Sequence, residues 1–208
     1  MVLASAVYGV DADIRAIADE FAHNGYIAAA PDLFWRSIPG PLPSSDKRTR
    51  ERSEPRLERI KMGEADISDT LAYLRRLPGF NGRAALMGLC YGGPYAIIGP
   101  KRLGYAAGIS CHGSQMLDYL EELEGLDRPV CVIWGDKDHR ASAEVLDAYR
   151  AAATRTPNLD LHIFSGIRHG YMMLGSPSAF DQKTRDFSMG RAFSLLEALA
   201  ARVVAPSS

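Results

Sequence analysis

The sequence predicts an α/β fold in which a mostly parallel sheet is covered by helices on both faces. Short apolar runs rich in Val, Ile and Ala alternate along the chain with longer segments of helical period. Continuous apolar runs of this length are typical of parallel strands that are buried on both faces. Polar, glycine-containing segments follow three of these runs, and sheets of this kind bind ligands beyond the carboxyl ends of their strands. We therefore expect an α/β domain with a site at that edge.

Six apolar segments are the expected strands. Each is short and is separated from the next by helical or loop sequence, which predicts crossover connections and parallel pairing. The segments are 2–7, 26–31, 83–88, 105–110, 129–134 and 159–164.

The expected helices lie between these strands. The first spans 11–25 and ends with Asn24 and Gly25, a common C-terminal stop. Another begins at Leu57, precedes Pro78, and places one apolar stripe on a single face; the stripe consists of Ile60, Ile67, Leu71 and Leu74. Residues 94–103 follow the third expected strand as a helix. The last helix should span 178–203, with an inward face formed by Phe180, Phe187, Leu195 and Leu199.

Composition and charge narrow the possible functions. With 208 residues, of which 47% are hydrophobic, the chain has enough apolar sequence for one domain over residues 1–208. A net charge of −1, without blocks of like charge, disfavours nucleic acid and membrane surfaces as partners. The N-terminus resembles no secretory signal, and no apolar run approaches the roughly 20 residues of a membrane span. We expect a cytoplasmic protein, monomeric or dimeric, that acts on a small molecule.

The segment "GLCYGG", residues 88–93, is the first candidate for chemistry. It lies between an expected strand and an expected helix, where glycines allow a tight turn that exposes the side chain of Cys90. The helix N-terminus favours a thiolate there. The amide of Tyr91 would face a developing oxyanion, and the second amide should come from the turn near Val7 and Tyr8. The alternative is a structural cysteine buried in a glycine-rich connection.

An acid and a histidine follow in the chain order nucleophile, acid, base. "GDKDH" follows one strand and contains Asp136 and Asp138, and "SGIRHGY" follows the last strand and contains His169. The position of the turn favours Asp138 as the partner of His169 and leaves Asp136 to cap the turn. Taken alone, each could be a solvated or structural residue, but their order and placement at strand ends favour a Cys-His-Asp triad.

These motifs resemble those of the dienelactone hydrolase (carboxymethylenebutenolidase) family, within the α/β-hydrolase superfamily. Residues 7–40 are similar to the family's segment from the first catalytic-side strand to its "PDL" turn. "GLCYGG", "GDKDH" and "RHGY" are similar to its three triad segments, which implies Cys90, Asp138 and His169 as the triad. The resemblance implies hydrolysis of esters or lactones through a thioester, with no cofactor and no metal. The chain begins at what resembles the family's third strand, so one or two N-terminal strands are expected to be absent.

Two positions depart from the family's pattern. Ala6 stands where the family has a glutamate that partners the resting thiol, and Met173 stands where it has an arginine that holds the substrate carboxylate. Arg48 aligns with a second family arginine. We therefore expect neutral esters and lactones to be cleaved at least as well as carboxylated ones, unless Arg48 supplies the missing cation.

The expected substrate contacts are Tyr8, Arg48, His112, Tyr171 and Met173. The other arginines in the Pro- and Ser-rich segment 35–55 should form a solvated face of a surface loop with a short helix. Cys111 and Cys131 should be buried structural thiols. Loss of the glutamate at Ala6 supports one rival interpretation, a non-catalytic relative that binds a small molecule or a protein partner. Transfer of the acyl group to an acceptor other than water is a third.

Overall fold

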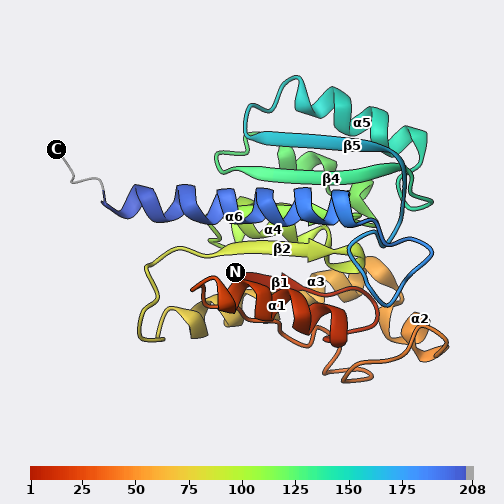
Figure 1. Cartoon of the computed structure of the whole chain (residues 1–208), viewed down its shortest axis with the longest axis horizontal. Helices are drawn as coiled ribbons and strands as arrows, with labels where there is room; N and C mark the ends of the chain where they lie inside the picture. Colours follow the sequence, from red (N-terminus) through yellow and green to blue (C-terminus); the bar gives the residue numbers. More distant parts are fainter. Residues whose placement is uncertain (205–208) are drawn as a thin grey trace.

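The computed structural model describes residues 1–204 and contains one parallel sheet in these residues (Figure 1). Its strands lie in the order β1-β2-β3-β4-β5, and every neighbouring pair is parallel. Their bounds are Val2–Ala4, Ala85–Leu89, Ala107–Cys111, Val130–Lys137 and Leu159–Arg168. All the carboxyl ends therefore lie along the same edge, as the alternation of apolar runs and helices predicts.

Helices cover both faces of the sheet. In Figure 1, α1 (Ala12–His23) and α6 (Gln182–Val204) lie in front of the strands. The opposite face is covered by α3, α4, the 3₁₀ segment η2 and α5, with bounds Arg56–Leu74, Tyr95–Arg102, Met116–Leu123 and Ala143–Ala153. This α/β arrangement confirms the predicted fold class.

The period-2 alternation of strand side chains divides the core between these two layers. Leu3 and Met87 pack toward α1 and α6, where Ile14 and Phe21 of α1 join the same cluster. Their sequence neighbours Val2 and Leu86 point the other way and pack with α3 and α4. Every residue of β2 and β3 is buried. The turns that follow these two strands therefore begin from tightly packed backbone.

The predicted strand 26–31 is wrong as a regular strand. Only Ala29 pairs with β1, through an isolated parallel bridge to Val2. The amide of Leu3 donates to the carbonyl of Ala29 at 2.8 Å, and the amide of Ala29 donates to Met1 at 3.0 Å. Pro31 has no amide hydrogen with which to continue the ladder, and the chain leaves the sheet at the "PDL" turn.

The last helix begins later than the sequence predicts. Residues 176–181 form turns, and the carboxylate of Asp181 accepts the amide of Thr184 at 2.8 Å, which is an N-terminal cap. The buried face is also rotated from the predicted one. Leu199 is buried as predicted, whereas Phe187 and Leu195 are only partly buried; the buried apolar residues of the helix are Met189, Ala192, Leu196 and Leu199.

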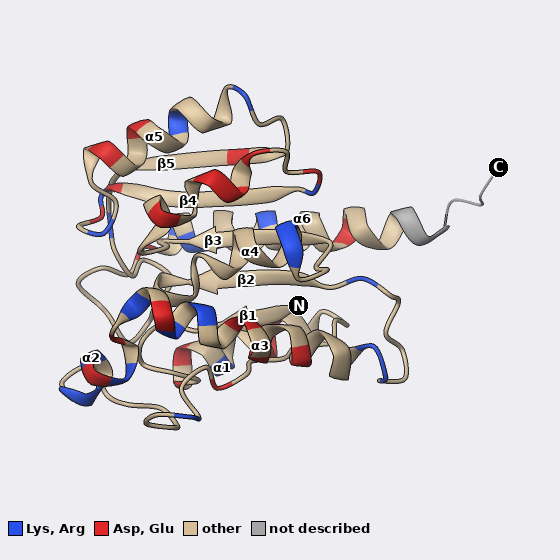
Figure 2. Cartoon of the chain, turned by 180° about the vertical axis from the view of Figure 1, so that it is seen from behind, with Lys and Arg blue, Asp and Glu red and all other residues tan. Residues whose placement is uncertain are grey.

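Charged residues of both signs are scattered over the helices and loops, as the view from behind shows (Figure 2). Neither Lys and Arg nor Asp and Glu form a large patch of one sign in this view. Among the described residues, no helix has the length and apolar character that a membrane crossing requires.

Candidate active site

Cys90 begins a sharp turn, η1 (Cys90–Gly92), directly after β2. Its φ is +51°, in the left-handed region that a non-glycine residue adopts only under local constraint. The turn is possible because its neighbours lack side chains: a Cβ on Gly88 would lie 2.2 Å from the carbonyl oxygen of Gly92, and a Cβ on Gly92 would lie 2.1 Å from that of Ala4. The glycines predicted to permit a nucleophile turn are thus required by packing.

The structure brings Asp138 and His169 together beside this turn. Asp138 follows β4 and His169 follows β5, at the carboxyl edge of the sheet. The Nδ1 atom of His169 lies 2.8 and 2.9 Å from the two carboxylate oxygens of Asp138. On its other side, the His169 ring lies close enough to Cys90 to lower the pKa of the thiol. The three side chains therefore lie together in the order Cys90, His169, Asp138, with the Asp138 carboxylate fully buried.

The ionisation of Cys90 and His169 is coupled. Burial raises the pKa of the Cys90 thiol, but the hydrogen bond and charge of His169 outweigh it, with smaller contributions from Arg56 and Ser114, so the pKa is lowered. Burial lowers the pKa of His169, but its hydrogen bonds to Asp138 and Cys90 prevail and raise the pKa to about 9. Both directions favour a thiolate–imidazolium pair near neutral pH.

Asp136, the alternative acid, is directed elsewhere. Its carboxylate accepts the Gly166 amide at 2.7 Å and the Ser165 hydroxyl at 3.2 Å, both on β5, and the residue is exposed. It thus ties β4 to β5 at the point where the pairing register shifts. This position agrees with the predicted structural role of Asp136.

Val7 and Tyr91, the predicted oxyanion-hole residues, lie in two turns at the carboxyl edge of the sheet, after β1 and after β2. Tyr91 follows Cys90 in η1. Val7 lies in the turn after β1, which is closed by a hydrogen bond of 3.0 Å from the Gly9 amide to the Ala6 carbonyl. Within residues 1–204, neither the Val7 nor the Tyr91 amide donates to another protein group. Both amides are therefore available to an anionic oxygen.

Ser114 and Arg56 complete the surroundings of the thiol, and sequence reasoning missed both. The Oγ atom of Ser114 lies 3.9 Å from the sulfur of Cys90, and the Ser114 amide donates to the Cys90 carbonyl at 2.9 Å. Arg56, the first residue of α3, donates to Ser114 Oγ at 2.9 Å. A signal existed for Ser114, because it follows the carboxyl end of β3; nothing local indicated which way Arg56 would face.

A cavity of about 410 Å³ adjoins Val7 and Tyr8 and is rich in cations. Three arginines line it, against one carboxylate, Glu54; the arginines are Arg50, Arg56 and Arg140. Burial raises the pKa of Tyr8, and the charge of Cys90 raises it further. The arginines of this cavity offer cationic partners that the comparison of Met173 and Arg48 with the family did not include.

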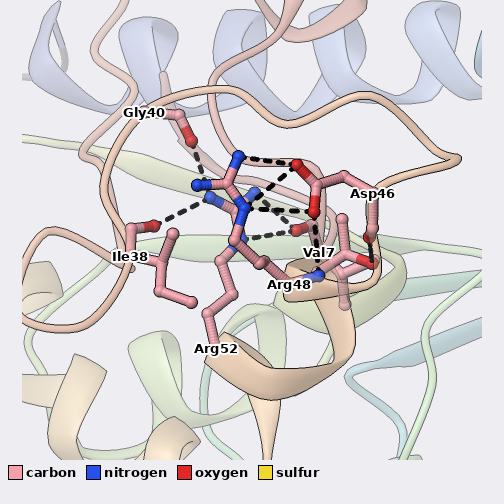
Figure 3. A network of polar contacts seen from close by, with 7 residues as sticks. Val7, Ile38, Gly40, Asp46, Arg48 and Arg52 are labelled. Atoms are coloured by element: carbon pink, nitrogen blue, oxygen red, sulfur yellow. Dashed lines mark hydrogen bonds and ion pairs between the residues drawn. The ribbon is translucent and has the colours of Figure 1, made fainter.

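The other predicted substrate contacts are placed differently. Arg48 is exposed and donates to Asp46 at 2.7 to 3.1 Å, so its guanidinium is held outside the cavity (Figure 3). Met173 is 5% exposed and lines a second cavity of about 740 Å³ that also includes Tyr8.

His112 and Tyr171, two of the expected substrate contacts, are buried in this structure. The Tyr171 hydroxyl pairs with Ser188 at 2.9 Å, and the His112 ring packs edge-on against both Tyr171 and His169. Burial lowers the pKa of His112 well below its usual value, and the charge of His169 lowers it further. The His112 imidazole is therefore neutral, and it packs edge-on against the ring of His169.

Arg52 is the largest departure from the predicted solvated face of arginines. It is 1% exposed, and its guanidinium donates to the backbone carbonyls of Val7, Ile38 and Gly40 (Figure 3). The helix that carries it, α2 (Arg48–Ser53), is too short for its apolar periodicity to reveal a buried side.

A second group of the same residue types lies away from Cys90. Ligand atoms of Cys131, Asp160 and His162 lie within 4.8 Å of one another, on β4 and β5. Asp160 is ion-paired with Arg191, so a guanidinium already neutralises the one carboxylate that a cation would need. Burial raises the pKa of Cys131 and raises that of Cys111 to about 12, so both thiols remain protonated, as predicted.

Comparison with known proteins agrees with this geometry. Residues 1–199 match the dienelactone hydrolase family. The chain is 28% identical over 202 residues to carboxymethylenebutenolidase 1 of Cupriavidus pinatubonensis, which covers 96% of this chain and 86% of the relative. It is 26% identical over 179 residues to a carboxymethylenebutenolidase of Pseudomonas putida, with 85% and 76% covered.

Solved structures show the same fold. A dienelactone hydrolase-like promiscuous phosphotriesterase from metagenomic libraries superposes with a TM-score of 0.77 at 17% identity, over 95% of this chain and 85% of the other. The esterase Pf2001 of Pyrococcus furiosus superposes with a TM-score of 0.65 at 14% identity, over 95% and 81%. The family match spans nearly the whole chain and includes the turn of Cys90, the segment of Asp138 and that of His169. The chain therefore belongs to the dienelactone hydrolase family, whose members are ester and lactone hydrolases.

Proposed function

We propose that this protein hydrolyses carboxylic esters or lactones through a thioester on Cys90. The observation that carries the proposal is that Cys90, His169 and the buried carboxylate of Asp138 lie together in that order, next to a turn that presents the thiol. The family's activity and the carboxymethylenebutenolidase relatives support the same reaction class.

The reaction follows from which group holds each proton. The Cys90 thiolate attacks the acyl carbon, and the carbonyl oxygen gains a negative charge that the amides of Val7 and Tyr91 stabilise. His169 gives its proton to the departing alkoxide or enolate, which leaves a thioester. Neutral His169, oriented by Asp138, then removes a proton from water, which attacks the thioester and releases the carboxylic acid and the thiolate. No step requires a metal or a cofactor.

The cavity beside Val7 and Tyr8 favours substrates with an anionic group. Arg140 and Arg56 line it, and a charge-assisted hydrogen bond to a substrate carboxylate contributes about 1.5 to 3 kcal/mol. We therefore propose that carboxylated esters or lactones are preferred. The expectation of neutral substrates, which considered only Met173 and Arg48, is the alternative.

Site-resolved mass spectrometry tests the nucleophile. The protein is mixed with p-nitrophenyl esters and enol lactones, and peptides are searched for an acyl group on Cys90; Cys111→Ala is the matched control, because it removes a thiol of raised pKa. We expect an acyl adduct on Cys90, and iodoacetamide labelling of Cys90 that abolishes turnover in parallel. Undiminished hydrolysis by Cys90→Ala would exclude the proposed mechanism, whereas a wild-type protein with neither adduct nor hydrolysis would favour the non-catalytic relative.

A further inference from the structure

Arg52 is a buried cation whose partners are backbone carbonyls. It is 1% exposed, and it forms no ion pair with a carboxylate within the described part of the chain. Burial lowers its pKa, which the charges of Asp32 and Asp46 offset in part. Burying a charge is unfavourable unless its hydrogen bonds are satisfied. The groups that accept hydrogen bonds from the Arg52 guanidinium therefore indicate which part of the chain Arg52 holds in place.

Half of those contacts converge on Val7. The Nε and Nη2 atoms of Arg52 donate to the Val7 carbonyl at 2.9 and 2.6 Å, while Nη1 donates to Gly40 at 2.6 Å and Ile38 at 3.0 Å (Figure 3). The peptide that precedes Val7 is held separately, because the Ala6 carbonyl accepts the Gly9 amide. The Val7 N–H shares a planar peptide unit with the Ala6 carbonyl, and the Val7 carbonyl shares the next unit with the Tyr8 N–H. With the first unit held by Gly9 and the second by Arg52, the backbone of Val7 between them is fixed on both sides.

The same guanidinium also contacts a ring that packs against Tyr91. Its carbon lies 4.3 Å from the ring centroid of Phe34, and the Phe34 ring packs against that of Tyr91 with centroids 5.0 Å apart. Tyr91 is 1% exposed, so its ring cannot move without displacing Phe34. Arg52 thus contacts Val7 directly and Tyr91 through one intervening ring.

We propose that Arg52 is a positioning residue for the oxyanion hole: it holds in place the turn that carries the Val7 amide and, through Phe34, the position of Tyr91. This inference rests on the proposed thioester mechanism. Arg52 touches neither substrate nor thiol, and acts only on the geometry of the two donors. A purely structural role, joining segment 38–40 to the β1 turn, predicts instead that all reactions of Cys90 are impaired equally.

Two reactions of the same thiol distinguish these roles. Iodoacetamide is attacked at a saturated carbon: the Cys90 C–S bond forms, iodide leaves, and no carbonyl oxygen gains charge. A p-nitrophenyl ester is attacked at its carbonyl, passes through an oxyanion, and releases p-nitrophenolate as the thioester forms. The experiment measures both rates at one pH in Arg52→Lys, since a single ammonium cannot place two donors on the Val7 carbonyl. Arg36→Lys is the matched control, because Arg36 lies in the same loop as Ile38 and Gly40 but pairs with Asp66 of α3.

We expect Arg52→Lys to release p-nitrophenolate about ten- to a hundredfold more slowly, with alkylation of Cys90 within about twofold of the wild-type rate. Arg36→Lys should change neither rate. If Arg52→Lys does not fold, Phe34→Leu keeps the guanidinium and removes its stacking partner, and should slow acylation alone. Equal losses in both reactions, or no loss, would overturn the positioning role. A wild-type protein that is alkylated at Cys90 but releases no p-nitrophenolate would instead refute the proposed function, and this role with it.

Discussion

Replacing Asp138 by asparagine tests the proposed triad most directly. Asp138 is 4% exposed, both its oxygens lie within 2.9 Å of Nδ1 of His169, and Oδ1 also accepts the Arg140 amide at 2.8 Å. In the variant the side chain has one acceptor and one donor. If the acceptor keeps the Arg140 amide, the donor faces Nδ1, and the proton of neutral His169 moves to Nε2, where it faces Cys90.

The tautomer change sets the size of the effect. A neutral His169 with its proton on Nε2 cannot take the proton of the thiol or of water, so we expect kcat to fall by about 10³- to 10⁴-fold. The pH profile should change as well. The hydrogen bond to Asp138 raises the pKa of His169, which reaches about 9. Without the carboxylate this pKa falls, so the leaving-group proton is lost at lower pH and the alkaline limb moves toward neutrality.

Asp136→Asn is the matched control, because it makes the same exchange at the end of the same strand. An amide oxygen can still accept the Gly166 amide, so we expect wild-type kcat and a loss of unfolding free energy of no more than about 1 kcal/mol. The assay follows p-nitrophenyl ester hydrolysis across both limbs of the pH profile, with chemical denaturation for stability. A larger loss of kcat in Asp136→Asn, or an alkaline limb that does not move in Asp138→Asn, would refute the assignment.

Two further predictions concern the thiol and the substrate. Arg56 can only donate to Ser114, which leaves the Ser114 hydroxyl proton free to donate to the Cys90 sulfur. Ser114→Ala should therefore raise the pH midpoint of Cys90 alkylation, measured by iodoacetamide rates. Ser110→Ala, a buried serine of β3, should leave the midpoint unchanged, and equal shifts in both would contradict the contact. For the substrate, an enol lactone with a free carboxylate should have a kcat/KM about tenfold or more above that of its methyl ester. Arg140→Met should reduce that preference, and a preference lost in Arg48→Met instead would show that the wrong arginine was chosen.

The sequence was sufficient for the parts of the fold that depend on local pattern. Five of the six expected strands, those at 2–7, 83–88, 105–110, 129–134 and 159–164, are strands in the structure to within a few residues, because burial on both faces leaves a continuous apolar run. The segment 26–31 has the same apolar character but makes only one bridge. Whether an apolar segment completes a ladder depends on the path of the chain beyond it, which composition does not describe.

Sequence alone also determined the part of the site that rests on backbone geometry and strand ends. A glycine-flanked Cys90 after a strand, and His169 after the last strand, meet because parallel strands end at one edge. Only the tertiary structure decided which arginines serve the site: Arg52 is buried against Val7, while Arg48, four residues earlier in the same short helix, is exposed. The reason is physical. Residues four apart lie on the same face of a helix, so periodicity cannot separate these two arginines. The tertiary fold brings the carbonyls of Val7, Ile38 and Gly40 to Arg52, whereas Arg48 pairs with Asp46 at the surface.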